Sequence, residues 1–157
     1  MKKFIALVVV LCAVMISSST ASASANWVWI YSDEYCTIYV DNNSIRRDYN
    51  YRGYVFRAFV KWIYSDAGRN RRIKNYRSAG LSLPKGMYNL SHDVVLEYFK
   101  AENGMKYSCT MDCVCYDKNG NTIPEMNFSK NQFEWRILPP DSIGEWIFDM
   151  VRARVPN

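Results

Sequence analysis

The chain has 157 residues, a formal net charge of +5 and an aromatic content of 15%. A chain of this length buries enough apolar surface to fold as one domain without metal or disulfide staples. The charge is mild and does not demand a polyanionic partner.

The N-terminus predicts export. Residues 1–25 have the three parts of a secretory signal peptide, namely a basic start at Lys2 and Lys3, an apolar core over 4–16, and small residues over 17–25 with two A-x-A cleavage sites. The apolar core is too short to cross a bilayer, so we expect no transmembrane anchor. We expect the protein at the cell surface, in the periplasm or outside the cell. This location makes nucleic acid, ATP-driven chemistry and cytosolic metabolites poor candidates for its partners.

The remaining residues, 26–157, form a single predicted domain of 132 residues. Loss of Lys2 and Lys3 from the 20 basic residues leaves 18 against 15 acidic ones, a net charge of +3. The first three predicted strands are 27–31, 36–40 and 54–64. The third is the clearest, because apolar side chains alternate there with Arg57 and Lys61.

The segment 65–89 has no clear periodicity and contains three glycines, Pro84 and a basic run over 69–77. We interpret it as a long loop with at most one or two helical turns. Loops of this length are uncommon in compact domains and are often functional.

Three further strands are predicted over 93–100, 105–116 and 122–128. Asn103-Gly104 and Asn119-Gly120 separate them, and Asn-Gly between apolar runs favours a type I′ turn because both central residues need positive φ. Two such turns in succession predict an antiparallel meander.

A short strand over 135–138 is followed by a predicted C-terminal helix. Ser142 and Glu145 have the spacing of a capping box. Apolar residues then recur at helical spacing and form one stripe, which contains Ile143, Trp146, Ile147, Met150 and Val151. We therefore predict an α+β fold, with an antiparallel sheet of about six strands and one C-terminal amphipathic helix packed on one face.

Four cysteines lie outside the signal peptide, at positions 36, 109, 113 and 115. The last three occupy alternate positions of one predicted strand, so we expect them to point the same way, into the core. Neighbours on one face of a strand lie about 6.5 Å apart, whereas a disulfide needs Cβ atoms about 3.8 Å apart. At most one ordinary disulfide is then expected, between Cys36 and one of Cys109, Cys113 and Cys115.

Three interpretations of these cysteines stay open. They are buried free thiols, a single disulfide from Cys36, or a four-cysteine metal site in which Cys113 and Cys115 chelate. The usual C-x₂-C spacing of a metal site is missing, so we expect neither a metal nor a cofactor.

The strongest candidate for a binding site is the basic run. Together with Arg46, Arg47 and Arg52, which are interleaved with Tyr49, Tyr51 and Tyr54, its cations would form a cationic, aromatic patch. The basic run contributes Arg69, Arg71, Arg72, Lys74 and Arg77 to it. Such a patch suits anionic glycans or acidic protein surfaces. The alternative is a solvated loop that aids solubility.

Catalytic motifs are not found. The one histidine, His92, is flanked by Ser91 and Asp93, and adjacent residues of an extended chain point apart rather than forming a triad. The chain contains no G-x-S-x-G, H-E-x-x-H or phosphate-binding glycine loop. We therefore expect a protein that is not an enzyme.

Several short motifs, taken in order, are similar to those of one family. They are Trp27–Tyr31, Tyr39–Ile45, Val60–Trp62, Tyr88–Ser91, Tyr116–Gly120, Trp135–Pro139 and Ser142–Glu145. Together they resemble the bacterial surface-adhesin protein E family over nearly all of the predicted mature chain. One feature departs from the family, which commonly ties its terminal helix to the sheet by a disulfide, because residues 142–154 contain no cysteine.

The resemblance implies an antiparallel sheet with a C-terminal helix against its concave face, and no enzymatic activity. It also implies binding to host matrix or serum proteins such as laminin and vitronectin, and the ability to form a homodimer. Besides this adhesin-like function, a periplasmic structural or accessory protein without a host ligand stays open, as does a thiol or metal-binding protein.

Overall fold

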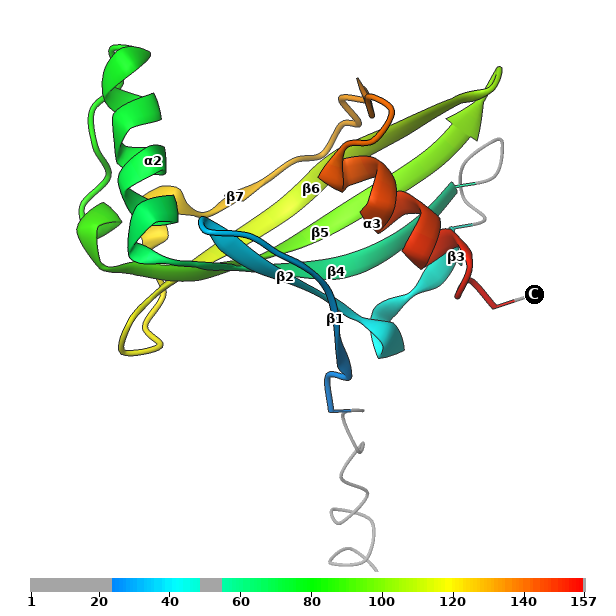
Figure 1. Ribbon diagram of the computed structural model, residues 1–157, viewed down its shortest axis with the longest axis horizontal. Coiled ribbons are helices and arrows are strands. Elements are labelled where there is room, and N and C mark those ends of the chain that lie inside the picture. Colours follow the sequence, from blue (N-terminus) through cyan, green and yellow to red (C-terminus); the bar gives the residue numbers. More distant parts are fainter. Residues whose placement is uncertain (1–23, 49–54, 157) are drawn as a thin grey trace, which may run out of the picture.

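The computed structural model describes residues 24–48 and 55–156, which form an antiparallel sheet with two α-helices on one face (Figure 1). The strands are β1 (Trp27–Ser32), β2 (Cys36–Asp41), β3 (Arg46–Asp48), β4 (Val55–Tyr64), β5 (Leu90–Glu102), β6 (Met105–Asp117), β7 (Phe128–Ser129) and β8 (Arg136–Ile137). The main strand order is β1-β2-β4-β5-β6-β7, with β3 also paired to β4 and β8 to β6. The predicted α+β class is confirmed.

The core lies on the face of the sheet that carries the helices. On β4, the alternate residues Phe56, Ala58 and Val60 are buried against this core, whereas Phe59 between them is exposed. The same alternation places Val95 and Phe99 of β5 on the helix side. The period-2 pattern of the sequence therefore identifies the buried face of the central strands.

The first Asn-Gly turn is confirmed and the second is different. Asn103 and Gly104 have φ values of 51° and 76°, as a type I′ turn requires between β5 and β6. At the second site Gly120 has a φ of 83°, but Asn119 is not among the positive-φ residues. The Asp117 side chain accepts hydrogen bonds there from the backbone N–H groups of Asn119 and Asn121. An aspartate side chain therefore shapes this turn.

The strand predicted over 122–128 is wrong. A short 3₁₀-helix, η3 (Pro124–Met126), interrupts the segment, and β6 pairs only with its two ends, through an isolated bridge from Tyr116 to Thr122 and through Phe128 of β7. Proline has no N–H to donate to a strand ladder, and its fixed φ suits the start of a helical turn. Two other 3₁₀-helices are η1 (Asn42–Ser44) and η2 (Met87–Asn89).

The predicted C-terminal helix is confirmed as α3 (Ile143–Arg152). The Ser142 hydroxyl accepts from the Glu145 N–H, and the Glu145 carboxylate accepts from the Asp141 N–H. Its buried face differs from the predicted stripe, because Phe148 is fully buried while Trp146 is half exposed. The face of α3 that packs against the sheet is therefore centred closer to Phe148 than the predicted stripe.

The loop interpretation of 65–89 is wrong over its first half. Residues Asp66–Ser78 form the helix α2, and the Ser65 hydroxyl caps it by accepting from the Gly68 N–H. Its basic residues are good helix formers, but Ile73 is its only buried large apolar side chain. A helix with no apolar stripe gives no periodicity for a sequence pattern to detect.

A β-bulge overturns the prediction that three cysteines share one face. Leu96 of β5 pairs with Asp112, and Glu97 pairs with Thr110, so Met111 is an extra residue. An extra residue in a strand breaks the alternation of side chains, so the residues before it and the residues after it no longer share the faces that a regular strand would give them. Cys113 and Cys115 consequently lie in the main core, whereas Cys109 packs with Val55 and Tyr98 on the other face.

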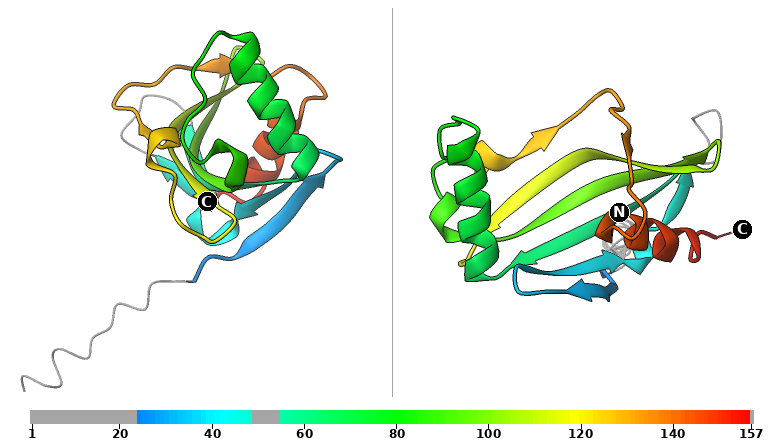
Figure 2. Two further views of the ribbon diagram at one scale, coloured as in Figure 1. Left: turned by 90° about the vertical axis from the view of Figure 1, so that its left-hand side faces the viewer. Right: turned by 45° about the horizontal axis from the view of Figure 1, so that its top comes forward.

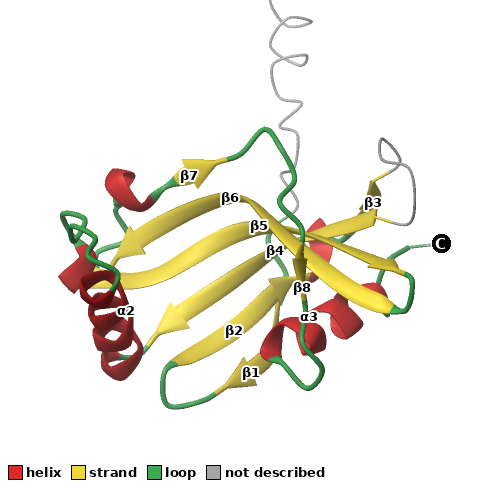
Figure 3. Ribbon diagram, turned by 90° about the horizontal axis from the view of Figure 1, so that it is seen from above, coloured by secondary structure: helices red, strands yellow, loops and turns green. Residues whose placement is uncertain are grey.

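The two helices lie at opposite ends of the core face, as two further directions of view show (Figures 2 and 3). In the second view of Figure 2, α2 stands across one end of the strands and α3 lies along the sheet near the other end. The helix α3 contacts β1, β4 and β6, so the sheet curves around it. In the described part of the chain, no helix has the length and apolar character needed to cross a membrane.

Candidate functional site

The helix α2 is fixed to the rest of the molecule by a close backbone approach and by two arginines. A Cβ atom added at Gly68 would lie 2.0 Å from the Tyr35 carbonyl oxygen, so only glycine fits where α2 meets the β1–β2 turn. Arg69 is buried, donates to the Leu90 carbonyl oxygen at 2.8 Å and forms an ion pair with Asp66. Arg69 therefore anchors the helix instead of lying in a binding surface.

Arg72 is the second anchoring arginine. Its guanidinium donates to a carboxylate oxygen of Asp93 at 2.7 Å and to the hydroxyl of Tyr64. Tyr64 in turn donates to the same oxygen, Asp93 Oδ2, at 2.7 Å. Of the predicted binding residues, Arg69 and Arg72 thus point inward and hold α2 to β4 and β5.

The three remaining cations of the basic run face solvent. The Arg71 guanidinium stacks 3.8 Å from the centre of the Tyr35 ring, and Arg77 donates to the Tyr88 hydroxyl at 2.8 Å. Lys74 is exposed between them. Within the described ranges, none of the three forms an ion pair with a carboxylate. We call Arg71, Lys74 and Arg77 the cationic face of α2.

Arg46 and Arg47 do not join this face. Both lie on β3, which pairs with the first residues of β4, whereas α2 follows the last residue of β4. A strand of 10 residues spans about 30 Å, so β3 and α2 are at opposite ends of the sheet. Arg52 and the tyrosines predicted to interleave with these cations, at positions 49, 51 and 54, lie outside the described residues.

Beneath α2, the carboxylate of Asp93 is buried and only half satisfied. Its Oδ2 accepts from Tyr64 and Arg72, whereas Oδ1 has no hydrogen-bond partner among the described residues. Burial raises the pKa of Asp93, and the charge of Arg72 together with these hydrogen bonds counteracts the rise. An unpartnered buried carboxylate oxygen is costly and calls for a physical explanation.

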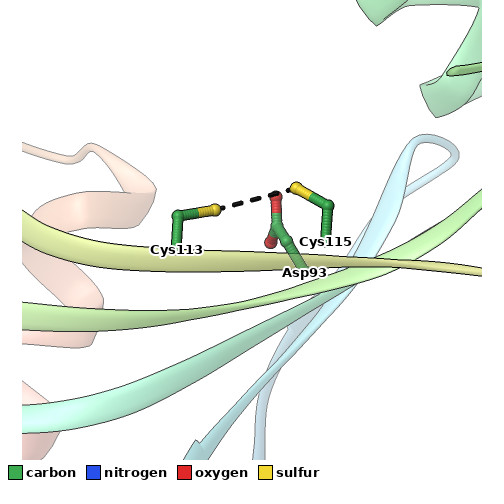
Figure 4. Close-up of side chains that lie close together, drawn as sticks. All are labelled: Asp93, Cys113 and Cys115. Carbon is green, nitrogen blue, oxygen red and sulfur yellow. Dashed lines mark hydrogen bonds between the residues drawn. The ribbon is translucent and has the colours of Figure 1, made fainter. Parts of the chain in front are cut away.

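Two thiols lie beside this carboxylate. The sulfur atoms of Cys113 and Cys115 are 3.8 Å apart, and both lie within 4.8 Å of a carboxylate oxygen of Asp93 (Figure 4). The hydrogen bond between the two thiols lowers the pKa of Cys115, while that same contact and burial raise the pKa of Cys113. Cys36, Cys109, Cys113 and Cys115 are all buried free thiols in the structure.

A cavity of about 330 Å³ separates the two helices on the core face. It is lined by β4, β5, β6 and the first turns of α3, and it extends from Ile147 to Tyr64 and Asp93. In its wall, Glu97 accepts a hydrogen bond of 2.7 Å from Thr110. Burial raises the pKa of Glu97, so two acidic groups line a largely apolar cavity.

Sequence reasoning did not identify the acidic residues of this region. Asp93 and Glu97 alternate with Val95 and Phe99 on β5, so the period-2 pattern already places two carboxylates on a buried face. That conflict between charge and burial was the available signal. The partnership of Asp93 with Arg72 and with the cysteines requires the fold.

No protein-family model matches this chain, and comparisons with curated proteins and with solved structures also give no match. The resemblance to the surface-adhesin protein E family therefore rests on the sequence motifs alone.

Proposed function

We propose that this protein is an exported, non-enzymatic binding module whose partner is an anionic polymer, with a heparin-like sulfated glycan as the preferred class. The observation that carries the proposal is the cationic face of α2. Its three exposed cations form no ion pair with a carboxylate among the described residues, and they lie on a helix that is anchored by Gly68, Arg69 and Arg72.

A division of roles along α2 supports the proposal. Gly68, Arg69 and Arg72 attach the helix to the sheet, and each has its own contact there. The cations at 71, 74 and 77 are all exposed, and the contacts of Arg71 with Tyr35 and of Arg77 with Tyr88 lie at the surface. Such a helix presents charge on a rigid support, and binding to it requires little ordering of the protein.

The spacing of the cations fits an extended anionic partner. At a rise of 1.5 Å per residue, positions 71, 74 and 77 extend over about 9 Å of the helix. Arginine donates to sulfate and carboxylate groups with two parallel hydrogen bonds, whereas lysine acts as a point charge. The Tyr35 and Tyr88 rings that contact Arg71 and Arg77 hold both guanidinium groups near the surface.

The signal peptide prediction and the family resemblance support an extracytoplasmic binding function. Host matrix and serum proteins form the second class of partner that we consider, and homodimer formation remains a prediction. The alternative is a periplasmic structural or accessory protein with no host ligand. Labelling of intact cells followed by fractionation separates the two, because exclusive periplasmic retention would favour the alternative.

Binding to immobilised heparin, laminin and vitronectin tests the proposal directly. We expect the triple variant Arg71→Glu, Lys74→Glu and Arg77→Glu to lose heparin affinity at least tenfold, and we expect wild-type binding to weaken as salt is added. The matched control reverses three exposed cations near the other end of the sheet, Arg46, Arg152 and Arg154.

The control has the same net charge as the test variant, so it separates a local site from a general charge effect. We expect it to retain most of the heparin affinity. Equal losses in both triple variants, or no heparin binding by the wild type, would contradict the proposal. Binding to laminin or vitronectin without binding to heparin would indicate that the partner is a protein and not a glycan.

A further inference from the structure

Next to the cavity, three side chains that ligate metals converge from two strands. Cys113 and Cys115 come from β6 and Asp93 from β5, directly opposite Cys115 in the strand pairing. Their ligand atoms all lie within 4.8 Å of one another. We propose that Asp93, Cys113 and Cys115 form a binding site for a thiophilic divalent cation of the zinc class.

The separation of the sulfurs fits this ion. Two sulfurs bound to one tetrahedral zinc ion, each at about 2.3 Å, lie about 3.8 Å apart. The sulfurs of Cys113 and Cys115 are 3.8 Å apart. Their Cβ atoms project from the same face of one strand, so the pair is held at a separation suited to chelation and unsuited to an ordinary disulfide.

The carboxylate supplies the second, independent observation. Asp93 is 96% buried, and its Oδ1 has no hydrogen-bond partner among the described residues. A pair of buried thiols needs no carboxylate beside it, but an oxygen ligand of a metal ion needs a free lone pair. Figure 4 shows the Asp93 carboxylate directed towards the space that the two thiols enclose.

The residues around the site balance the charge of its ligands and orient the Asp93 carboxylate. Two thiolates and one carboxylate carry three negative charges, of which a divalent ion neutralises two and the Arg72 guanidinium the third. Tyr64 and Arg72 hold Oδ2 of Asp93, which leaves Oδ1 for the ion and fixes the plane of the carboxylate. Binding the ion releases the two thiol protons to solvent.

The cavity gives the ion a path to the carboxylate ligand. Asp93 lines the end of the cavity beneath α2, and the two thiols lie next to Asp93. With three protein ligands, the fourth tetrahedral position belongs to water or to a small ligand in the cavity. Sites of this composition bind zinc or cobalt in preference to calcium or magnesium, which favour all-oxygen coordination.

Titration of the reduced, metal-free protein with Co²⁺ tests the site. We expect thiolate-to-cobalt charge-transfer absorption that saturates at one ion per chain and disappears when Zn²⁺ is added. Cys113→Ser and Cys115→Ser should each abolish it, and Asp93→Asn should weaken Co²⁺ binding at least tenfold. The matched control is Cys109→Ser, which changes a buried thiol on the opposite face of the sheet and should retain the absorption.

Absence of the absorption from the wild-type protein would overturn the proposal. The proposal would also be overturned if Cys109→Ser lost the absorption while Cys113→Ser and Cys115→Ser kept it. If the serine variants fail to fold, X-ray absorption of the zinc-loaded wild type decides the matter. Two sulfur neighbours and at least one oxygen neighbour around the zinc would support the site. A zinc ion with only oxygen or nitrogen neighbours would contradict it. Neither outcome depends on whether heparin binds to α2.

Discussion

The two helices of this protein cover opposite ends of the same sheet face and are held there in different ways. Phe148 of α3 is fully buried and packs against Phe56 and Phe99, with ring centres 5.1 and 6.1 Å away. The helix α2 packs Ile73 and the partly buried Tyr76 against the core, and it is also attached through a glycine contact and two arginines. One end is therefore held by apolar packing, and the other is held in addition by a polar assembly.

This difference agrees with the proposal that the α2 end carries the function. Attachment by apolar burial stabilises a fold at little risk, whereas a buried carboxylate with its arginine gives a smaller net gain and is destabilising if one partner is lost. Local departures from the patterns that favour folding occur preferentially at functional sites. The α2 end has three of them, namely a polar helix, a half-satisfied Asp93 and two converging thiols.

The largest loss of stability is expected at the α3 end. Phe148→Ala removes a fully buried aromatic ring and should lower the free energy of unfolding by about 3–5 kcal/mol, measured by urea denaturation. Trp146→Ala on the same helix is the control. Trp146 is half exposed and contacts Tyr31 edge to face, so a clearly smaller loss is expected. Equal losses would contradict the assignment of the buried face.

The next largest effect is expected in the polar assembly. Arg72→Met leaves Asp93 buried without its cation and should lower the free energy of unfolding by about 3 kcal/mol, measured by urea denaturation. This is the lower end of the range for a broken buried ion pair, because Arg72 is partly exposed. Adding Asp93→Asn removes the uncompensated charge and should restore part of the loss. If the double variant is no more stable than Arg72→Met, the two residues are not coupled.

A smaller loss is expected where α2 meets the β1–β2 turn. Gly68→Ala places a methyl group against the backbone of Tyr35, and the helix must shift, at a cost of about 1–3 kcal/mol. The exposed residue Asn70 provides the control, because Asn70→Ala on the same helix should change stability by less than about 0.5 kcal/mol. Thermal unfolding of the two variants compares them directly, and a Gly68→Ala protein as stable as the wild type would rule out the close approach.

The smallest effect depends on pH. The pKa of Glu97 is raised above its ordinary value of 4.5 by burial, so the folded state binds a proton more tightly than the unfolded state. The contribution of Glu97 to stability is thus present below pH 4.5 and is lost as pH rises through the folded pKa. Glu97→Gln should melt at a higher temperature than the wild type at pH 7 and at a similar temperature at pH 4. A variant less stable at pH 7 would contradict the sign.

The sequence predicts the α3 end better than the α2 end, and the reason is physical. Alternation on β4 and the capping box at Ser142 are local signals, and both are confirmed. The helix α2 was missed because its anchors are single contacts with distant segments, such as Gly68 with Tyr35. The position of Cys109 was missed because a bulge at Met111 reverses the alternation without any mark in the sequence.

The same limits apply to the candidate site. The basic run identified Arg71, Lys74 and Arg77 correctly as exposed cations, but nothing local distinguishes them from Arg69 and Arg72, which point inward. Their roles depend on the phase of a helix that the sequence pattern does not reveal. Long-range pairing likewise decides that Arg46 and Arg47 lie at the far end of the sheet.

The most direct test of the central claim, that α2 is a binding surface and α3 a structural element, is an NMR titration with a heparin oligosaccharide. We expect backbone amide shifts to concentrate on residues 66–78 and on neighbouring Tyr35 and Tyr88, and we expect residues 143–152 to stay unchanged. Shifts concentrated on 143–152, or no shifts at an oligosaccharide concentration that saturates other heparin-binding proteins, would contradict it.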